Sequence, residues 1–439
     1  MSEGLSARLA GFAAGLSAAD IPAETSAAIR LSALDWAAVA LAGRDEPVAR
    51  IMRNVVSAEG GRAEAFVFGA ARAPVRSAAL VNGATGHALD YDDTHFLHIG
   101  HPSVVIFPAA LAMAERVGAS GAAFLTAATI GFEASIRTGH WLGRRHYEHG
   151  FHQTATAGCF GATLAAGRLL GLAPEPMGHA LGIAATRASG LKSQFGTMGK
   201  PYNAGLAAAN GVEAALLAGA GFISRPDGLE CEQGFGETHA GAATHAALDG
   251  LGARFLLGDV SYKFHACCHG LHAALEALAA LTGGGVYSAP EIEVLRVCTH
   301  PRWLGVCNIA KPRTGLEAKF SYRMVAALAL AGHDTGALGT YADDTCADPL
   351  LVALRDKVEV IADDGLAESA ARVELCLTTG ATERCEYDLN QPMSATDKQG
   401  RLRRKAVALT GAARTESLQR AIDDLPEAES IAGFVAALG

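Results

Sequence analysis

Helix-length segments rich in alanine and glycine follow one another through the first half of this chain. An opening helix is predicted at 22–42, because Pro22 suits a first helical position and Gly43 a stop. Further helical segments are predicted at residues 75–90, 108–117, 121–140, 154–170, 176–190 and 203–220. Side chains this small let helices approach closely, and 50% of the 439 residues are hydrophobic. The pattern predicts a helix-rich body with crowded interfaces and a large core.

The hydrophobic period changes in the last third of the chain. Residues 291–297 and 358–361 alternate as strands do, and 373–387 is typical of a hairpin that turns at Gly380. Helices are predicted between these strands, at 316–330 and 350–357, and again from Asp397 onward. We therefore predict a mainly α protein in which a smaller α+β lid domain is inserted into a large all-helical domain. The predicted bounds are 1–266 for the first helical segment, 267–394 for the lid and 395–439 for the returning segment.

Composition excludes several classes of function. The net charge is −9 and no basic stretch is longer than 401–405, so we expect no nucleic-acid partner. The strongly apolar stretch at 104–114 is shorter than the ~20 residues of a membrane span, so we expect no membrane partner. The nine cysteines are an odd number and the first residues do not resemble a signal peptide. We expect a cytoplasmic protein with free thiols.

Seven Asp and His side chains lie between His87 and His101, in otherwise small and apolar surroundings. Burying such groups is costly unless they are paired, so this segment is the first candidate for chemistry. The carboxylates at 90, 92 and 93 do not follow a calcium-loop pattern, although a bound metal stays an alternative. Asp90 and Thr94 are four residues apart, so one helical turn would place both on one face. Asp92 and Asp93 are alternatively interpreted as caps or loop supports.

Three further segments are candidates. His152 lies where a small-residue helix begins, and it can bind a carboxylate, shuttle a proton or merely cap that helix. Lys200 follows Gly199, but Gln194 and Pro201 rule out a phosphate loop. The stretch 262–272 holds Lys263 with two adjacent cysteines and three histidines, a spacing that disfavours zinc. No Gly-x-Ser-x-Gly elbow supports a serine hydrolase.

Several of these motifs, in this order, resemble the MmgE/PrpD family, whose members include dehydratases, decarboxylases and epimerases. The matching stretches are 82–94, 101–103, 131–133, 150–154, 199–200 and 263–272, with a weaker match at 320–321. The resemblance implies a helical domain with an α+β lid, a homodimer, and a cleft that binds small polycarboxylates with no metal and no other cofactor. It implies active-site roles for Asp90, Thr94, His101, His152, Lys200 and Lys263.

The chain departs from the family pattern at two positions. Cys268 stands where the decarboxylases have a histidine, and Met324 stands where many members have a tyrosine, with Tyr322 two residues earlier. These departures argue against decarboxylation and against methylcitrate itself as the substrate.

The chemistry that such enzymes share is loss of a proton or of CO2 next to a carboxylate, which builds enolate-like negative charge. We therefore predict a cofactor-independent hydro-lyase (a dehydratase) that acts on a small hydroxylated di- or tricarboxylate. An epimerase or isomerase that uses the same intermediate is the alternative, followed by a decarboxylase, a metal-dependent hydrolase and a non-catalytic scaffold. The expected catalytic residues are His101, His152, Lys200, Lys263 and Asp90. The expected substrate-binding residues are Thr94, Lys200, Cys268, His272 and Tyr322.

Overall fold

The computed structural model describes residues 4–439, which divide into two compact units. Unit 1 consists of the described residues up to Tyr262 together with Thr410–Gly439, and unit 2 is Lys263–Leu409. The chain is 60% helical, which confirms the prediction of a mainly α protein. The helix at 395–410 was predicted to return to the large domain, whereas its contacts place nearly all of it in unit 2.

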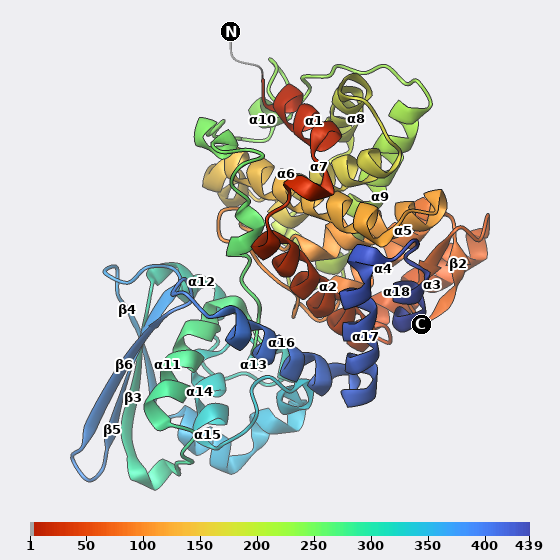
Figure 1. Cartoon of the computed structure of the whole chain (residues 1–439). Helices are drawn as coiled ribbons and strands as arrows, with labels where there is room; N and C mark the ends of the chain where they lie inside the picture. Colours follow the sequence, from red (N-terminus) through yellow and green to blue (C-terminus); the bar gives the residue numbers. More distant parts are fainter. Residues whose placement is uncertain (1–3) are drawn as a thin grey trace. The chain divides into compact units, whose positions relative to one another are not determined.

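Unit 1 is built mainly from helices (Figure 1), and many of its buried residues are alanines. Its helices are α1 (Leu5–Gly15), α2 (Ala23–Gly43), α3 (Pro47–Glu59), α4 (Val75–His87), α5 (Ser103–Val117), α6 (Gly121–Glu148), α7 (Gln153–Leu169), α8 (Pro174–Arg187), α9 (Gly199–Gly219), α10 (Phe235–Thr238), α17 (Ala412–Asp424) and α18 (Ala432–Leu438). A two-stranded antiparallel hairpin, β1 (Ala65–Val67) and β2 (Ala70–Ala73), accompanies them. The prediction of an all-helical domain is therefore wrong in this detail. The hairpin was not predicted because strands of three and four residues are too short to show a period of two.

Two helix boundaries differ from the prediction for identifiable reasons. Helix α5 begins at Ser103 rather than at 108, and Pro108 lies inside it. A proline inside a helix removes one backbone hydrogen bond, and here the fully buried neighbours Phe107 and Ala109 hold the helix in place. Helix α4 ends at His87 rather than at 90, since Asp90 adopts a left-handed φ of 51° that no continuing helix permits.

Helices α4 and α9 touch through their backbones. A Cβ atom on Gly205 would lie 2.2 Å from the carbonyl oxygen of Leu80, and one on Gly83 would lie 2.7 Å from the Cα of Gly205. Only glycine permits this approach. The contact matters because α4 ends at His87 and α9 begins beside Lys200, two residues of the site described below.

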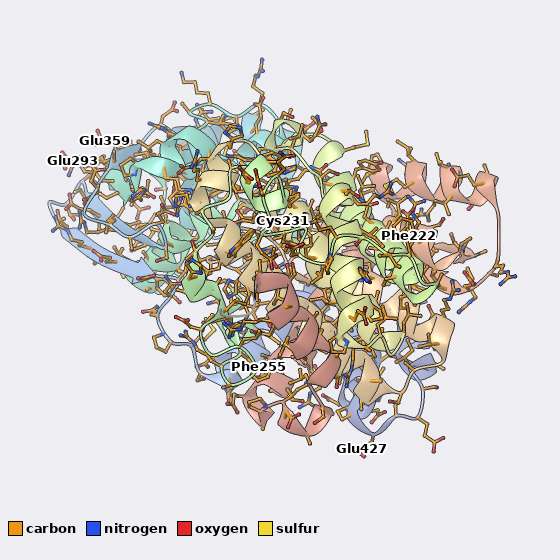
Figure 2. The ribbon with its side chains drawn as sticks, turned by 90° about the horizontal axis from the view of Figure 1, so that it is seen from above. Phe222, Cys231, Phe255, Glu293, Glu359 and Glu427 are labelled. Atoms are coloured by element: carbon orange, nitrogen blue, oxygen red, sulfur yellow. The ribbon has the colours of Figure 1, made fainter. Side chains whose placement is uncertain are left out.

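Unit 2 is a four-stranded sheet with helices on it (Figure 1). The strand order is β4 (Val358–Ala362), β3 (Ile292–Thr299), β5 (Ala370–Leu377), β6 (Thr382–Asp388). Strands β3 and β4 are parallel, and the other two pairs are antiparallel. The helices are α11 (His272–Thr282), α12 (Leu304–Cys307), α13 (Gly315–Ala318), α14 (Tyr322–Leu330), α15 (Pro349–Arg355) and α16 (Ala395–Thr410). Figure 2 shows Glu293 of β3 and Glu359 of β4 projecting into solvent, and both side chains are exposed.

Two sequence predictions in unit 2 have different outcomes. The β5–β6 hairpin turns at Gly380 with a φ of 89°, which confirms the predicted turn. The predicted helix at 316–330 is instead two helices, α13 and α14. Ser321 separates them, because its side chain accepts a hydrogen bond from the backbone N–H of Met324 and so caps the second helix.

Within residues 4–439, α2 is the one helix long and apolar enough to cross a membrane, and 67% of its most apolar window is buried inside the protein.

Candidate active site

The segment between α4 and α5 is an irregular loop, residues 88–102, that carries the Asp and His cluster. Its hairpin-like tip closes where the backbone N–H of His95 donates to the carbonyl of Gly100, 2.9 Å away. The backbone of Thr94 exchanges two hydrogen bonds of 2.8 Å with that of Ser261. Thr94 is therefore in a β-bridge, and the idea that Asp90 and Thr94 share one helical face is wrong.

Asp92 is the centre of the cluster. Its side chain is fully buried, with Oδ1 2.8 Å from Nδ1 of His87 and Oδ2 2.9 Å from Nδ1 of His101. The first contact is an aligned hydrogen bond, and the second is a close polar contact without hydrogen-bond alignment. Burial alone would raise the pKa of Asp92, but the two imidazoles outweigh it and hold that pKa far below its ordinary value. Asp92 is therefore a carboxylate that fixes both rings.

The pKa of Asp93, the next residue, is shifted in the opposite direction from that of Asp92. It is also fully buried, and its Oδ1 accepts a hydrogen bond from the backbone N–H of Ser103 at 3.1 Å. Burial, with the nearby carboxyls of Asp35 and Asp92, raises the pKa of Asp93 well above its ordinary value. The surroundings of Asp93 therefore favour its neutral form, whereas those of Asp92 favour the carboxylate.

Lys200 completes the polar surface of the cluster. Its ammonium lies 2.6 Å from Oδ2 of Asp90, and Oδ1 of Asp90 lies 3.6 Å from Nε2 of His101. These side chains are 15%, 29% and 12% exposed, so a small solute can reach them. Burial lowers the pKa of His101 to about 4, despite the neighbouring Asp92. His101 is therefore neutral at pH 7 and can accept a proton.

His152 lies at the start of α7, beside these groups. Its ring stacks at 6.0 Å from that of His87, and its Nδ1 is 3.3 Å from the side-chain amide nitrogen of Asn203. Burial, followed by the charges of His87 and Lys200, holds the pKa of His152 well below its ordinary value. Asn203 can only donate through that nitrogen, so Nδ1 accepts and the proton of the neutral ring is on Nε2.

The structure thus brings together four of the predicted residues, namely Asp90, His101, His152 and Lys200. Thr94 is held at the loop edge, with its hydroxyl 3.4 Å from the carbonyl oxygen of Ser261. Two further residues lie at the site and were not predicted from the sequence: Asn203, and Phe195, whose ring packs edge-on against His152 at 5.0 Å. Asn203 follows Lys200 by three residues on a helix, a spacing that places both on one side and was an available signal.

Four side chains of the cluster also have the composition of a cation site. One ligand atom from each of His87, Asp90, Asp92 and His101 lies within 4.8 Å of all the others. In this arrangement the Lys200 ammonium already pairs with Asp90, and the Nδ1 atoms of His87 and His101 lie 2.8 and 2.9 Å from oxygens of Asp92. The residues therefore fit a metal less well than they fit the internal charge pairing that they already make.

The remaining predicted residues belong to unit 2 and are largely buried there. Lys263 is 2% exposed and His272 is 1% exposed, and burial holds the pKa of His272 well below its ordinary value. Cys268 is half-buried. Tyr322 is 1% exposed and its hydroxyl donates to the carbonyl of Gly270 at 2.6 Å, so that proton is already used inside the fold.

The cluster holds two neutral histidines and a paired lysine, and it belongs to a chain with a helical unit and an α+β unit. Such a group of side chains is typical of an acid–base enzyme that acts on an anion. The N-terminal domain of the MmgE/PrpD family matches residues 7–247, and its C-terminal domain matches residues 265–428. The chain belongs to the MmgE/PrpD family.

Its relatives carry the name of one activity. Cis-aconitate decarboxylase of Aspergillus terreus is 28% identical over 458 residues, which cover 96% of this chain and 92% of that protein. Another protein of this name, from strain NIH 2624 / FGSC A1156 of that fungus, is 32% identical over 63% of this chain and 59% of its own length. Cis-aconitate decarboxylase of Homo sapiens is 34% identical over 38% of this chain and 36% of its own length. Family and relatives indicate an enzyme, and the relatives are named decarboxylases rather than dehydratases.

Proposed function

We propose that this protein is a lyase that acts on a small tricarboxylate or dicarboxylate through an enolate-like anion. The observation that carries the proposal is the pairing of two neutral histidines with opposite proton positions beside Lys200. His101 and His152 both have lowered pKa values, caused first by burial. Neither histidine is a cation at neutral pH, so the site offers one base, one donor and one ammonium.

The proposed base is Nε2 of His101. The Nδ1 atom of this ring faces the Asp92 carboxylate at 2.9 Å, which favours the tautomer with its proton on Nδ1. The lone pair of Nε2 then points to the side where Asp90 and Lys200 lie. Asp92 acts by orienting this ring, so it is a positioning residue.

The proposed acid is Nε2 of His152. Asn203 keeps the proton off Nδ1, so the ring presents an N–H donor to a departing hydroxyl or to a substrate carboxylate. The Lys200 ammonium exchanges its partner Asp90 for the substrate carboxylate, where it stabilises the developing negative charge. One base and one acid are what dehydration of a hydroxy acid requires, and we propose dehydration as the reaction.

Decarboxylation of an aconitate-like acid is the second candidate. The names of the relatives favour it, and the same ammonium would stabilise the carbanion that loss of CO2 leaves. Epimerisation through the same intermediate is the third. We also propose that three residues of unit 2 contribute to the reaction, namely Lys263, Cys268 and His272. Thr94 is a proposed hydrogen-bond donor to the substrate. For Tyr322, substrate contact through its hydroxyl proton would require breaking its bond to Gly270.

The remaining expectations are proposals of the same kind. We propose a cytoplasmic homodimer that needs no metal or organic cofactor and in which unit 2 serves as a lid. Apolar side chains that surround the start of α9 support a protein partner, since Leu191, Met198 and Tyr202 are 51%, 53% and 43% exposed.

Incubation of the protein with citrate-, malate-, aconitate- and aspartate-like acids in D2O, followed by 1H and 13C NMR, tests the function. Appearance of an alkene from a hydroxy acid supports dehydration, loss of a carboxyl carbon as CO2 indicates decarboxylation, and deuterium uptake without other change indicates epimerisation. His101→Asn should abolish the reaction, whereas His149→Asn, which changes an exposed histidine, should not. If no acid exchanges or converts while the protein is folded, the proposal is refuted.

A further inference from the structure

Phe195 is an aromatic side chain inside the polar site, and the reaction proposed above gives it no part. The centre of its ring lies 5.0 Å from that of the His152 ring, and the two rings are nearly perpendicular. The Lys200 ammonium lies over the ring, 5.3 Å from its centre, which is within the range of a cation–π contact. Phe195 is nevertheless 38% exposed. An apolar surface beside both the proposed acid and the proposed anion-binding group is therefore open to a solute.

The backbone ties Phe195 to two sides of the site. Its N–H donates to the carbonyl of Lys192 at 2.9 Å, and the N–H of Lys192 donates to the carbonyl of Gly150 at 2.8 Å. Gly150 stands two residues before the proposed acid. On the other side, the N–H of Lys200 donates to the carbonyl of Thr197 at 3.2 Å. The loop that carries Phe195 is therefore fixed both to the segment of the acid and to the start of α9.

The turn between Phe195 and Lys200 is tightly folded. The Thr197 hydroxyl donates to the carbonyl of Gln194 at 2.8 Å and accepts from the N–H of Gly199 at 3.0 Å. A Cβ atom on Gly199 would lie only 2.9 Å from the Cβ atom of Gln194, so a side chain at this position would push the turn open. The position of Phe195 is therefore set by a compact turn.

We infer that Phe195 determines substrate specificity by favouring acids whose carbon next to the Lys200-bound carboxylate carries hydrogen rather than a hydroxyl or a charged group. The inference rests on the proposed function, in which one small acid places a carboxylate at Lys200 and a departing hydroxyl at His152. The carbon that joins these groups then lies along the Phe195 ring, because the ring is next to both side chains. A malate-like acid, with a CH2 group at this carbon, is therefore preferred over a tartrate-like acid with a second hydroxyl.

The chemistry of the ring accounts for this preference. A CH2 group covers apolar surface of the ring and removes it from water. A hydroxyl group there gives up hydrogen bonds to water for which the ring offers no strong replacement, and a carboxylate meets the negative face of the π-system.

Two polar side chains near Phe195 already use their donors. The Thr197 hydroxyl donates to the carbonyl of Gln194. The side-chain nitrogen of Asn203 lies 3.3 Å from both Nδ1 of His152 and the carbonyl oxygen of Leu191. These groups therefore give a hydroxylated carbon little compensation for its lost water.

The test compares matched pairs of acids by steady-state kinetics, malate with tartrate and citrate with hydroxycitrate. In the wild type we expect kcat/KM to be about 10–100-fold higher for the acid without the extra hydroxyl, and Phe195→Asn should reduce this ratio about tenfold. Phe195→Leu keeps an apolar side chain and should keep most of the preference. Phe222→Asn is the matched control and should leave the ratio unchanged, since Phe222 follows the other end of α9 and is 52% exposed (Figure 2).

Titration calorimetry with succinate and tartrate is a second measurement, and it needs no turnover. We expect the wild type to bind succinate more tightly, and Phe195→Asn to lose this preference while its circular dichroism stays that of the wild type. Equal affinity for the two acids in the wild type, or an unchanged preference in Phe195→Asn, would overturn the inference. If Phe195→Asn does not fold, the wild type and Phe195→Leu decide. A protein that prefers succinate but converts no acid would refute the proposed reaction and still support the role of Phe195.

Discussion

The ammonium of Lys200 lies 2.6 Å from Oδ2 of Asp90, a residue whose φ of 51° places it outside both helix and strand. A non-glycine residue in the left-handed region is uncommon and is retained where the surroundings enforce it. Here the strained residue supplies the counter-charge for the lysine that is proposed to meet the substrate. The ion pair holds the Lys200 ammonium in position until an anion replaces the Asp90 carboxylate.

Lys200→Met should therefore abolish most activity without unfolding the protein. We expect kcat/KM to fall by about 10²–10³-fold, the usual loss when one fixed donor to a developing oxyanion is removed. Lys192→Met is the matched control, since Lys192 lies 3.8 Å above the Tyr147 ring and outside the Asp90–Lys200 pair. Steady-state kinetics on the acid identified by NMR make the comparison, and equal losses in both variants would contradict the assignment.

Asp92 and Asp93 should lose different amounts of stability on the same substitution. Asp92→Asn removes a carboxylate that two imidazoles face, and we expect a loss of about 2–4 kcal/mol in the free energy of unfolding at pH 7.5. Asp93→Asn replaces a carboxyl group whose raised pKa favours the neutral form with a neutral amide of the same shape, and we expect a loss below about 1 kcal/mol. Urea unfolding measures both, and a larger loss in Asp93→Asn would show that the protonation states are reversed.

Stability should fall as the pH is lowered from 6.5 toward 4. Burial lowers the pKa of His95, His101 and His146 to about 4 and that of His98 to about 3. Between pH 6.5 and 4 these histidines bind protons in the unfolded chain but not in the folded chain. Each histidine therefore lowers the free energy of unfolding by up to about 1.4 kcal/mol per pH unit. Glu133 and Asp93 act in the opposite direction, because burial raises the pKa of Glu133 to about 7 and that of Asp93 well above its ordinary value, but they are two groups against four histidines.

Urea unfolding at pH 7.5, 6.5, 5.5 and 5.0 tests this dependence. His98→Gln removes one of the buried rings, so the free energy of unfolding of this variant should fall less steeply as the pH is lowered. A free energy of unfolding that stays constant over this range would show that the buried histidines take up protons without cost.

Replacement of the buried Arg137 should be among the most destabilising substitutions in this protein. It is fully buried and its guanidinium donates to the carbonyls of Ala247, Asp249 and Arg254 and to the Glu133 carboxylate. Arg137→Met should destabilise the protein by about 3–5 kcal/mol, because it leaves these acceptors unpaired. Arg62→Met, at an exposed position, should change stability by less than about 0.5 kcal/mol. Similar thermal melting curves for the two variants would contradict this prediction.

Much of the helical body could be predicted because alanine, glycine and proline mark helix interiors and ends. The errors arose where tertiary contacts override those signals. Pro108 was interpreted as a helix start, although α5 begins at Ser103, and Ser321 was not recognised as the cap that separates α13 from α14. The hairpin at β1 and β2 was missed because its strands are too short for a period to appear.

The candidate site was partly predictable for a different reason. Asp90, His101, His152 and Lys200 each stand in a motif that is unusual for its surroundings, so the sequence singles them out. Asn203 was missed because an asparagine inside a helix, even one three residues after Lys200, is a weak signal until its partner His152 is known. The opposite protonation of Asp92 and Asp93 could not be predicted, since it depends on which neighbour each carboxyl faces in three dimensions.

The backbone contact between Gly83 and Gly205 has a consequence for protein engineering. Replacing helical glycine by alanine is a common route to thermostability, with a gain of about 0.4–1 kcal/mol at a compatible position. At these two positions the added methyl group would instead force α4 and α9 apart. A design that ranks helix positions by intrinsic propensity alone would choose both glycines, and would separate Asp90 from Lys200 while aiming only at a more heat-resistant enzyme.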